Sequence, residues 1–226
     1  SRAFTGSKIE LEEVLALVDA DQAVFPFNEY EYLICNLIEK RGLTYKQYIE
    51  IRTEYISENP HLWIFEISAP RGFGEKFAQT YVQGKCSKLK KPNKKLDENY
   101  TGEYDLWLDG ITIEVKASRA VDSDSEEPLY VKALSRNTEK RFLMNFQQLK
   151  PQCCDVFIWV AVFRDEIVLW IISSDEVLSN PLFSKGQHRG NEGQLHIKDD
   201  NIHVLNEFEL KNDDIETAIR EAAERN

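Results

Sequence analysis

Asp105, Glu114 and Lys116 are the residues of this chain whose types and spacing could do chemistry together. They flank Asp109-Gly110, a pair that favours a two-residue β-turn because both turn positions need positive φ. Alternating apolar and polar residues on both sides predict two half-buried strands joined by this turn. If the residues next to the turn pair with each other, Asp105 faces Glu114, and Lys116 shares that face. The sequence therefore predicts a hairpin that gathers two carboxylates and one ammonium group.

Two carboxylates about 5 Å apart on neighbouring strands repel each other unless a cation or a proton lies between them. Such oxygen ligands suit Mg²⁺, and the expected ligands are Asp105, Glu114 and the backbone carbonyl of Val115. Bound Mg²⁺ polarises a phosphoryl oxygen and lowers the pKa of a bound water, which Lys116 can orient. This chemistry is that of phosphodiester hydrolysis. The alternative is a surface ion-pair cluster that contributes little to stability.

The same spacing occurs a second time, at Asp200, Glu209 and Lys211. In this second set the aspartate would lie within a turn formed by residues 199–201, and the glutamate is followed by an acidic helix. The first set is followed by a predicted helix and a buried apolar strand instead. Sequence context therefore favours the first set as the site.

The segments around the hairpin predict an α/β or α+β fold, with a mixed central sheet flanked by helices. A helix from Gly72 to Val82 places Glu75 upstream of the hairpin, with Gln79 one turn later on the same face. Residues 137–150 fit a helix, residues 156–163 a strand buried on both faces, and residues 167–172 a further strand. Glu75 is therefore a further candidate for the site.

The 226 residues suffice for one core and are too few for two independent domains, so we expect a single domain spanning 1–226. Its N-terminal section, 1–67, is expected to be helical, with helices near 8–19, 28–40 and 45–58. The core is expected to cover 70–172. The remainder, 173–226, is expected to contain a polar loop, short strands at 194–198 and 202–205, and a helix at 213–225.

Charge is distributed unevenly along the chain. The net charge of −11 disfavours a protein that coats itself in nucleic acid, yet six of the eleven residues from 85 to 95 are lysine. This run is either a solvated loop or a contact to a phosphate backbone, for which Lys88, Lys90 and Lys91 are the candidates. No apolar run approaches the roughly 18 residues of a membrane span. The four cysteines show no disulfide or zinc spacing, so we expect a cytoplasmic protein without membrane contact.

With these residues in view, the chain resembles the PD-(D/E)xK nuclease superfamily over roughly residues 70–172. Asp105, Glu114 and Lys116 match the superfamily motif, and Glu75 matches the further acid that such enzymes often carry on a preceding helix. The predicted helix containing Gln148, followed by the apolar strand, is similar to the common core. Tyr104 stands where the motif's name has proline, a departure that many members share.

Within this superfamily, size and layout are most like a type II restriction endonuclease. The resemblance implies a restriction-endonuclease-like core and Mg²⁺-dependent cleavage of double-stranded DNA at a short, usually palindromic site, leaving 5′-phosphates. It also implies a homodimer, because a palindrome has two-fold symmetry.

Residues that could read the DNA sequence are expected in two places. Ser118 and Arg119 follow the lysine of the motif, and a glycine-rich polar loop contains the others, Gln187, His188, Arg189 and Asn191. Arginine suits guanine, and asparagine or glutamine suits adenine. Two alternatives remain open: a repair or junction-resolving nuclease on the same core, and a DNA-binding protein without catalysis.

Overall fold

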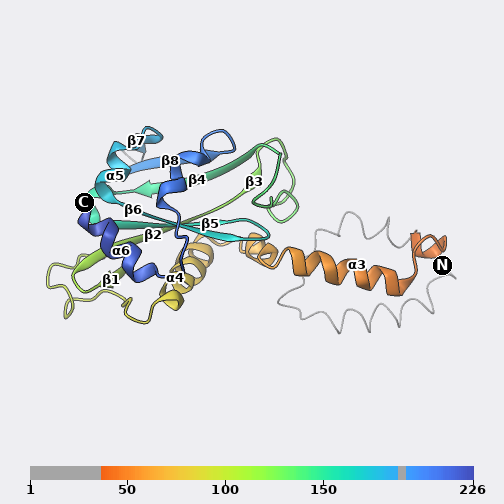
Figure 1. The fold of residues 1–226 in the computed structure, drawn as a ribbon, viewed down its shortest axis with the longest axis horizontal. Helices are drawn as coiled ribbons and strands as arrows, with labels where there is room; N and C mark the ends of the chain where they lie inside the picture. Colours follow the sequence, from red (N-terminus) through yellow and green to blue (C-terminus); the bar gives the residue numbers. More distant parts are fainter. Residues whose placement is uncertain (1–36, 188–191) are drawn as a thin grey trace.

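The computed structural model describes residues 37–187 and 192–226 and has a mixed α+β fold with two four-stranded sheets (Figure 1). The first sheet has the strand order β1-β2-β5-β6, comprising β1 (Leu106–Leu108), β2 (Ile111–Arg119), β5 (Val156–Val162) and β6 (Ile167–Ser173). The second has the order β3-β4-β8-β7, comprising β3 (Val121–Asp122), β4 (Phe142–Leu149), β8 (Glu192–Lys198) and β7 (Phe183–Gln187). The predicted mixed α+β class is confirmed.

The helical elements are mostly short. The α-helices are α3 (Tyr45–Glu58), α4 (Gln79–Lys85), α5 (Ser174–Ser179) and α6 (Ile215–Glu224). The 3₁₀-helices are η2 (Leu62–Glu66), η4 (Pro151–Cys153) and η6 (Ile202–Phe208), and η3 (Gly72–Ala78) is a π-helix that continues directly into α4.

The hairpin β1–β2 forms in the predicted register. Asp109 and Gly110 occupy the turn with φ of 47° and 100°, as a primed turn requires. Leu108 pairs with Ile111, and the pairing continues outward to Leu106 and Ile113. On its other side β2 pairs in parallel with β5, which makes the first sheet mixed.

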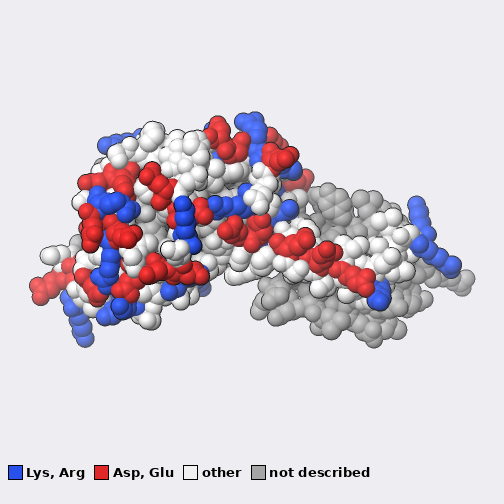
Figure 2. Space-filling model, in the orientation of Figure 1, with Lys and Arg blue, Asp and Glu red and all other residues white. Residues whose placement is uncertain are grey.

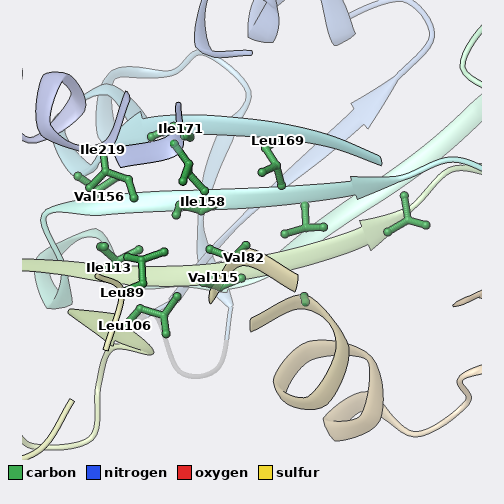
Figure 3. Packing of buried hydrophobic residues seen from close by; sticks show 14 of the residues in the cluster. Val82, Leu89, Leu106, Ile113, Val115, Val156, Ile158, Leu169, Ile171 and Ile219 are labelled. Carbon is green, nitrogen blue, oxygen red and sulfur yellow. The ribbon is translucent and has the colours of Figure 1, made fainter. Parts of the chain in front are cut away.

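Both faces of the first sheet are covered, one by helices and the other by the second sheet, so all seven residues of β5 are buried. One face packs against α4 and α6, and Figure 3 shows Val82 of α4 and Ile219 of α6 beside the side chains of β2 and β5. The other face packs against the second sheet, where Phe146 stacks on Trp159 with ring centroids 5.3 Å apart. Such an aromatic pair contributes about 0.5–1.5 kcal/mol beyond its buried area.

The helix predicted at residues 137–150 is wrong, because Phe142–Leu149 forms strand β4. Phe142, Phe146 and Leu149 have helical spacing, but Phe142, Met144 and Phe146 also alternate as in a strand, and the structure buries all of these side chains. Pairing with β8, far along the chain, decides between the two patterns. Gln148 lies exposed at an irregularity of this pairing, with φ of 56°.

The C-terminal part departs from the prediction in two segments. Residues 184–187, expected within the polar loop, lie in strand β7. Residues 194–198 lie in β8, and the predicted terminal helix is α6. The strand predicted at 202–205 is wrong, since those residues belong to the 3₁₀-helix η6. Asn201 closes the preceding turn by accepting from the Lys198 N–H at 2.8 Å and donating to the His196 carbonyl at 3.1 Å.

The third predicted N-terminal helix is confirmed as α3. It begins after Thr44, whose hydroxyl accepts from the Gln47 N–H while the Gln47 side chain accepts from the Thr44 N–H. The predicted helix at 8–19 and most of that at 28–40 lie outside the described residues. Figure 1 shows α3 extending away from the sheets. Within the described ranges, no helix is long and apolar enough to cross a membrane.

Candidate active site

Asp105 lies at the outer end of β1 and is held by three hydrogen bonds. Its N–H donates to the carbonyl of Ile113 at 2.9 Å. Its Oδ2 accepts from the Val115 N–H at 2.9 Å, and its Oδ1 accepts from Nε2 of Gln79 at 2.6 Å. The carboxylate is therefore fixed in orientation by the neighbouring strand and by the first residue of α4.

Glu114 and Lys116 project from β2 on the face that Asp105 shares. Nζ of Lys116 lies 2.7 Å from Oε1 of Glu114, and the two side chains are only 20% and 16% exposed. In the register of the sheet they are neighbours of Phe157 and Trp159 on β5. The apolar surroundings strengthen the attraction between the carboxylate and the ammonium group.

The carboxyl groups of Asp105 and Glu114 lie near enough for each to affect the ionisation of the other. Burial raises the pKa of both acids, and that of Glu114 reaches about 7. At Glu114 the attraction of the Lys116 ammonium group lowers the pKa, but burial and the negative charge of Asp105 together raise it by more. The Val115 N–H and the Lys116 ammonium oppose the rise at Asp105. Without a cation between them, the two acids therefore resist carrying two negative charges at once.

The donor set fits Mg²⁺. The N–H and the carbonyl of a strand residue point to the same edge, so the carbonyl of Val115 faces the side on which Asp105 lies. Two acids and one carbonyl are the hard oxygen ligands that Mg²⁺ takes while keeping several waters. Among the described residues, no group of three histidine, cysteine or acidic side chains is arranged to hold a metal.

Gln79 and Lys91 extend the site beyond the predicted residues. The Gln79 side chain donates to Asp105 and accepts from the Lys91 ammonium group, and the residue is only 8% exposed. The sequence offered one signal for Gln79, its position one turn after Glu75 on the same helix face. The helix spacing could not predict that Gln79 binds Asp105, because Asp105 is far away in the chain.

A polar cleft of about 500 Å³ opens beside these residues, lined by Glu75, Lys76, Gln79, Thr80, Lys91, Pro92, Tyr100, Gly102, Tyr104 and Asp105. Glu75 thus lines this cleft, and its catalytic role stays a prediction. Its side chain is 60% exposed and lies 3.5 Å from Arg71. Of the acid pair, Asp105 lines the cleft with it.

The lysine run divides into two groups. Lys85 and Lys88 are paired with acids at the start of α6, Lys85 with Asp213 at 3.1 Å and Lys88 with Glu216 at 2.9 Å. Figure 2 shows acidic and basic side chains interleaved on the face that carries α6. Lys90 lies against β1, where its ammonium group is 5.8 Å from the centre of the Trp107 ring. Lys90 and Lys91 are therefore the candidate phosphate contacts nearest the acid pair.

Ser118 and Arg119 have packing roles. The hydroxyl of Ser118 is buried and accepts from the Asn145 N–H at 2.9 Å, which ties β2 to β4. The Arg119 guanidinium donates to the carbonyls of Ile64 and Ile67 at 3.1 and 2.5 Å and lies 3.7 Å from the Phe73 ring centre. Burial lowers its pKa to about 10. Both side chains therefore bind the protein's own backbone, and their role in reading DNA stays a prediction.

The remaining predicted DNA-reading residues, His188, Arg189 and Asn191, lie outside the described residues, and Gln187 is the last residue of β7. The first residue of β8, Glu192, lies 3.4 Å from the ammonium group of Lys150.

The competing set at Asp200, Glu209 and Lys211 does not form a site. Asp200 lies exposed in the turn after β8, and Glu209 accepts from Arg136 at 2.7 Å. The intervening η6 separates the two acids, so no hairpin sets them opposite each other.

Comparison with protein-family models returned no match, and no curated protein matches the chain.

Proposed function

We propose that this protein is a Mg²⁺-dependent endonuclease of the PD-(D/E)xK type that hydrolyses phosphodiester bonds of double-stranded DNA. The observation that carries the proposal is the proximity of Asp105, which directly precedes β1, to the Glu114–Lys116 ion pair on β2 of the same hairpin. A surface ion-pair cluster would not require two acids that are mostly withdrawn from solvent. The acidic net charge limits nonspecific adhesion to DNA and leaves binding to a local surface.

The arrangement of strands supports a restriction-endonuclease-like core. The hairpin carries both acids, and β5 follows parallel to the strand that bears Glu114 and Lys116. The connection from β2 to β5 runs through β3 and β4 where the superfamily resemblance implied a helix. This departure lies outside the acid-bearing strands and leaves the proposed chemistry unchanged.

Each residue of the site has a defined task in hydrolysis. Asp105, Glu114 and the Val115 carbonyl would hold the ion, which supplies charge neutralisation at the phosphate and a water of lowered pKa. Glu114 must release its proton before both carboxylates can act as ligands. Lys116 orients the attacking water. The water oxygen bonds to phosphorus as the bond to the 3′-oxygen breaks, and proton exchange with solvent leaves a 3′-hydroxyl and a 5′-phosphate.

The proposal also includes the statement that a homodimer cuts the DNA at a specific sequence. The polar segment of the sequence that contains Gln187, His188, Arg189 and Asn191 supplies side chains of the kinds that pair with base edges. Two-fold symmetry then follows from cutting both strands of a palindrome.

Digestion of a plasmid of known sequence, with Mg²⁺ present or replaced by Ca²⁺, tests the function. Discrete fragments in Mg²⁺ support the sequence-specific enzyme. A smear indicates a nuclease that recognises DNA shape or cuts without preference. Intact DNA on many templates, with retained DNA binding, contradicts the nuclease and leaves a binding protein.

A further inference from the structure

The polar groups of the site form a continuous array across four elements. Lys116 contacts Glu114, Glu114 lies near Asp105, Asp105 accepts from Gln79, and Gln79 accepts from Lys91. The acid pair is thus enclosed between two ammonium groups. One belongs to the predicted motif, and the other comes from the loop that follows α4.

The two ends of this array differ in exposure. The side chain of Lys116 is 20% exposed and lies behind Glu114, whereas Lys91 is an exposed residue. Lys91 also lines the polar cleft together with Gln79 and Asp105. A phosphate group that enters through this cleft therefore meets Lys91 before it reaches the acid pair.

The Gln79 amide can serve its two partners in one orientation only. Its NH₂ group faces the Asp105 carboxylate and its oxygen faces the Lys91 ammonium group. The flipped amide would set oxygen against carboxylate and NH₂ against ammonium, and both contacts would be repulsive. The Gln79 N–H bonds to the carbonyl of Gly74, five residues earlier, at the end of the π-helical turn. Such π-helical turns occur frequently at functional sites.

The backbone next to Lys91 is fixed as well. The Lys90 N–H donates to the Trp107 carbonyl at 3.0 Å, and the Trp107 N–H donates to the Lys90 carbonyl at 2.9 Å. Pro92 follows and forms part of the cleft wall. Of the six lysines between residues 85 and 95, all of them described, Lys91 is the one that lines this cleft.

From this arrangement we infer that Lys91 is a second catalytic lysine, which contacts the reacting phosphate from the cleft side, and that Gln79 is the residue that positions it. This inference rests on the proposed nuclease function. Lys91 neutralises charge that develops on a non-bridging phosphate oxygen as the water oxygen bonds to phosphorus and the bond to the 3′-oxygen breaks. It transfers no proton, so the overall reaction remains addition of one water.

The test compares Lys91→Met with Lys94→Met, which removes the same charge from an exposed position of the same loop outside the cleft wall. Single-turnover cleavage is measured with saturating enzyme in Mg²⁺, and DNA affinity is measured in Ca²⁺. Lys91→Met is expected to slow cleavage by on the order of 100-fold and to change affinity by less than about threefold. Lys94→Met is expected to cut at the wild-type rate.

Two further measurements separate catalysis from folding. Lys91→Cys treated with bromoethylamine regains an ammonium group at nearly the same reach and is expected to recover most of the rate, with treated wild-type protein as control. Gln79→Leu is expected to slow cleavage, and its effect is expected to be smaller in the Lys91→Met protein than in the wild-type protein, because the Lys91 contact is already lost there and only the contact to Asp105 remains to be removed.

If the wild-type protein cuts DNA and Lys91→Met cuts equally fast at saturation, the inference fails while the nuclease function stands. Independent, multiplicative effects of Gln79→Leu and Lys91→Met would contradict the positioning role. A wild-type protein that cuts no DNA would overturn both proposals.

Discussion

Two segments of this chain carry an aspartate, a glutamate and a lysine at identical spacing, and they have different structures. Around Asp105, an Asp-Gly turn with positive φ at both positions joins two strands, and Asp105, just before β1, accepts from the Val115 N–H beside Glu114 on β2. Around Asp200, the side chain of Asn201 closes the turn and a 3₁₀-helix follows. The turn residues, and the strand β5 that supports the first segment, therefore decide whether the acids meet.

The largest expected difference between the segments is in cleavage. Asp105→Asn removes one charge of the acid pair, weakens the hold on Mg²⁺ and is expected to slow single-turnover cutting by on the order of 1,000-fold. Asp200→Asn, the matched change in the second segment, is expected to cut at the wild-type rate. Gel assays with both variants at equal concentration check this. Equal loss in the two variants would remove the distinction between the segments.

Substitution of the lysines is expected to give a somewhat smaller difference in cleavage rate between the two segments. Lys116→Met is expected to slow cleavage by on the order of 100-fold while DNA binding in Ca²⁺ changes little, since Lys116 lies behind Glu114 and has 20% of its side chain exposed. Lys211→Met is expected to have no effect on either quantity. Parallel binding and single-turnover assays measure both. A Lys116→Met protein that cuts normally would show that this lysine serves only to stabilise Glu114.

The acid pair should also make metal-free stability depend on pH. The pKa of Glu114 is raised to about 7 from an ordinary 4.5, so the folded state keeps a proton that the unfolded chain releases between these values. Its contribution is complete below pH 4.5 and is lost as pH rises through 7, by at most about 3 kcal/mol. Denaturant unfolding in EDTA at pH 5 and pH 7.5 measures the decline.

Glu114→Gln is expected to abolish this decline, and Glu209→Gln, its counterpart in the second segment, is expected to retain it. A decline of the same size in both variants would assign the effect to other groups.

The smallest expected effects concern the two turns. Gly110→Ala introduces a side chain at φ of 100° and is expected to lower the free energy of unfolding by about 1–2 kcal/mol. Asn201→Ala removes two hydrogen bonds at the second turn and is expected to cost about 1 kcal/mol. Thermal unfolding measures both, and cutting assays should show reduced activity for Gly110→Ala alone. Reduced cutting by Asn201→Ala would contradict the claim that only the first segment belongs to the active site.

Local patterns predicted the elements whose structure is set locally. The Asp-Gly turn predicted the register of β1 and β2, the apolar run predicted β5, and the helix cap predicted α3. Strand β4 was missed because its residues fit two periodicities, and pairing with β8 decides between them. Periodicity alone cannot settle such a segment.

The site was predicted where its residues share a hairpin and was missed where distant segments meet. Asp105, Glu114 and Lys116 lie within one supersecondary unit, so their spacing predicted their contact. Gln79 joins them through packing of α4 against the sheet, which spacing does not encode. Arg119 was expected to read DNA, yet its guanidinium binds the carbonyls of Ile64 and Ile67 in a distant part of the chain.

Iron-mediated cleavage of the polypeptide tests most directly which segment holds the metal. Fe²⁺ takes the place of Mg²⁺, and ascorbate with peroxide then generates radicals that cut the backbone near the bound ion. The predicted result is cutting near Asp105 and Glu114 that excess Mg²⁺ suppresses and that Asp105→Asn abolishes. Suppressible cutting near residues 200–211, or none near the hairpin, would contradict the assignment of Asp105 and Glu114 as the metal-binding acids.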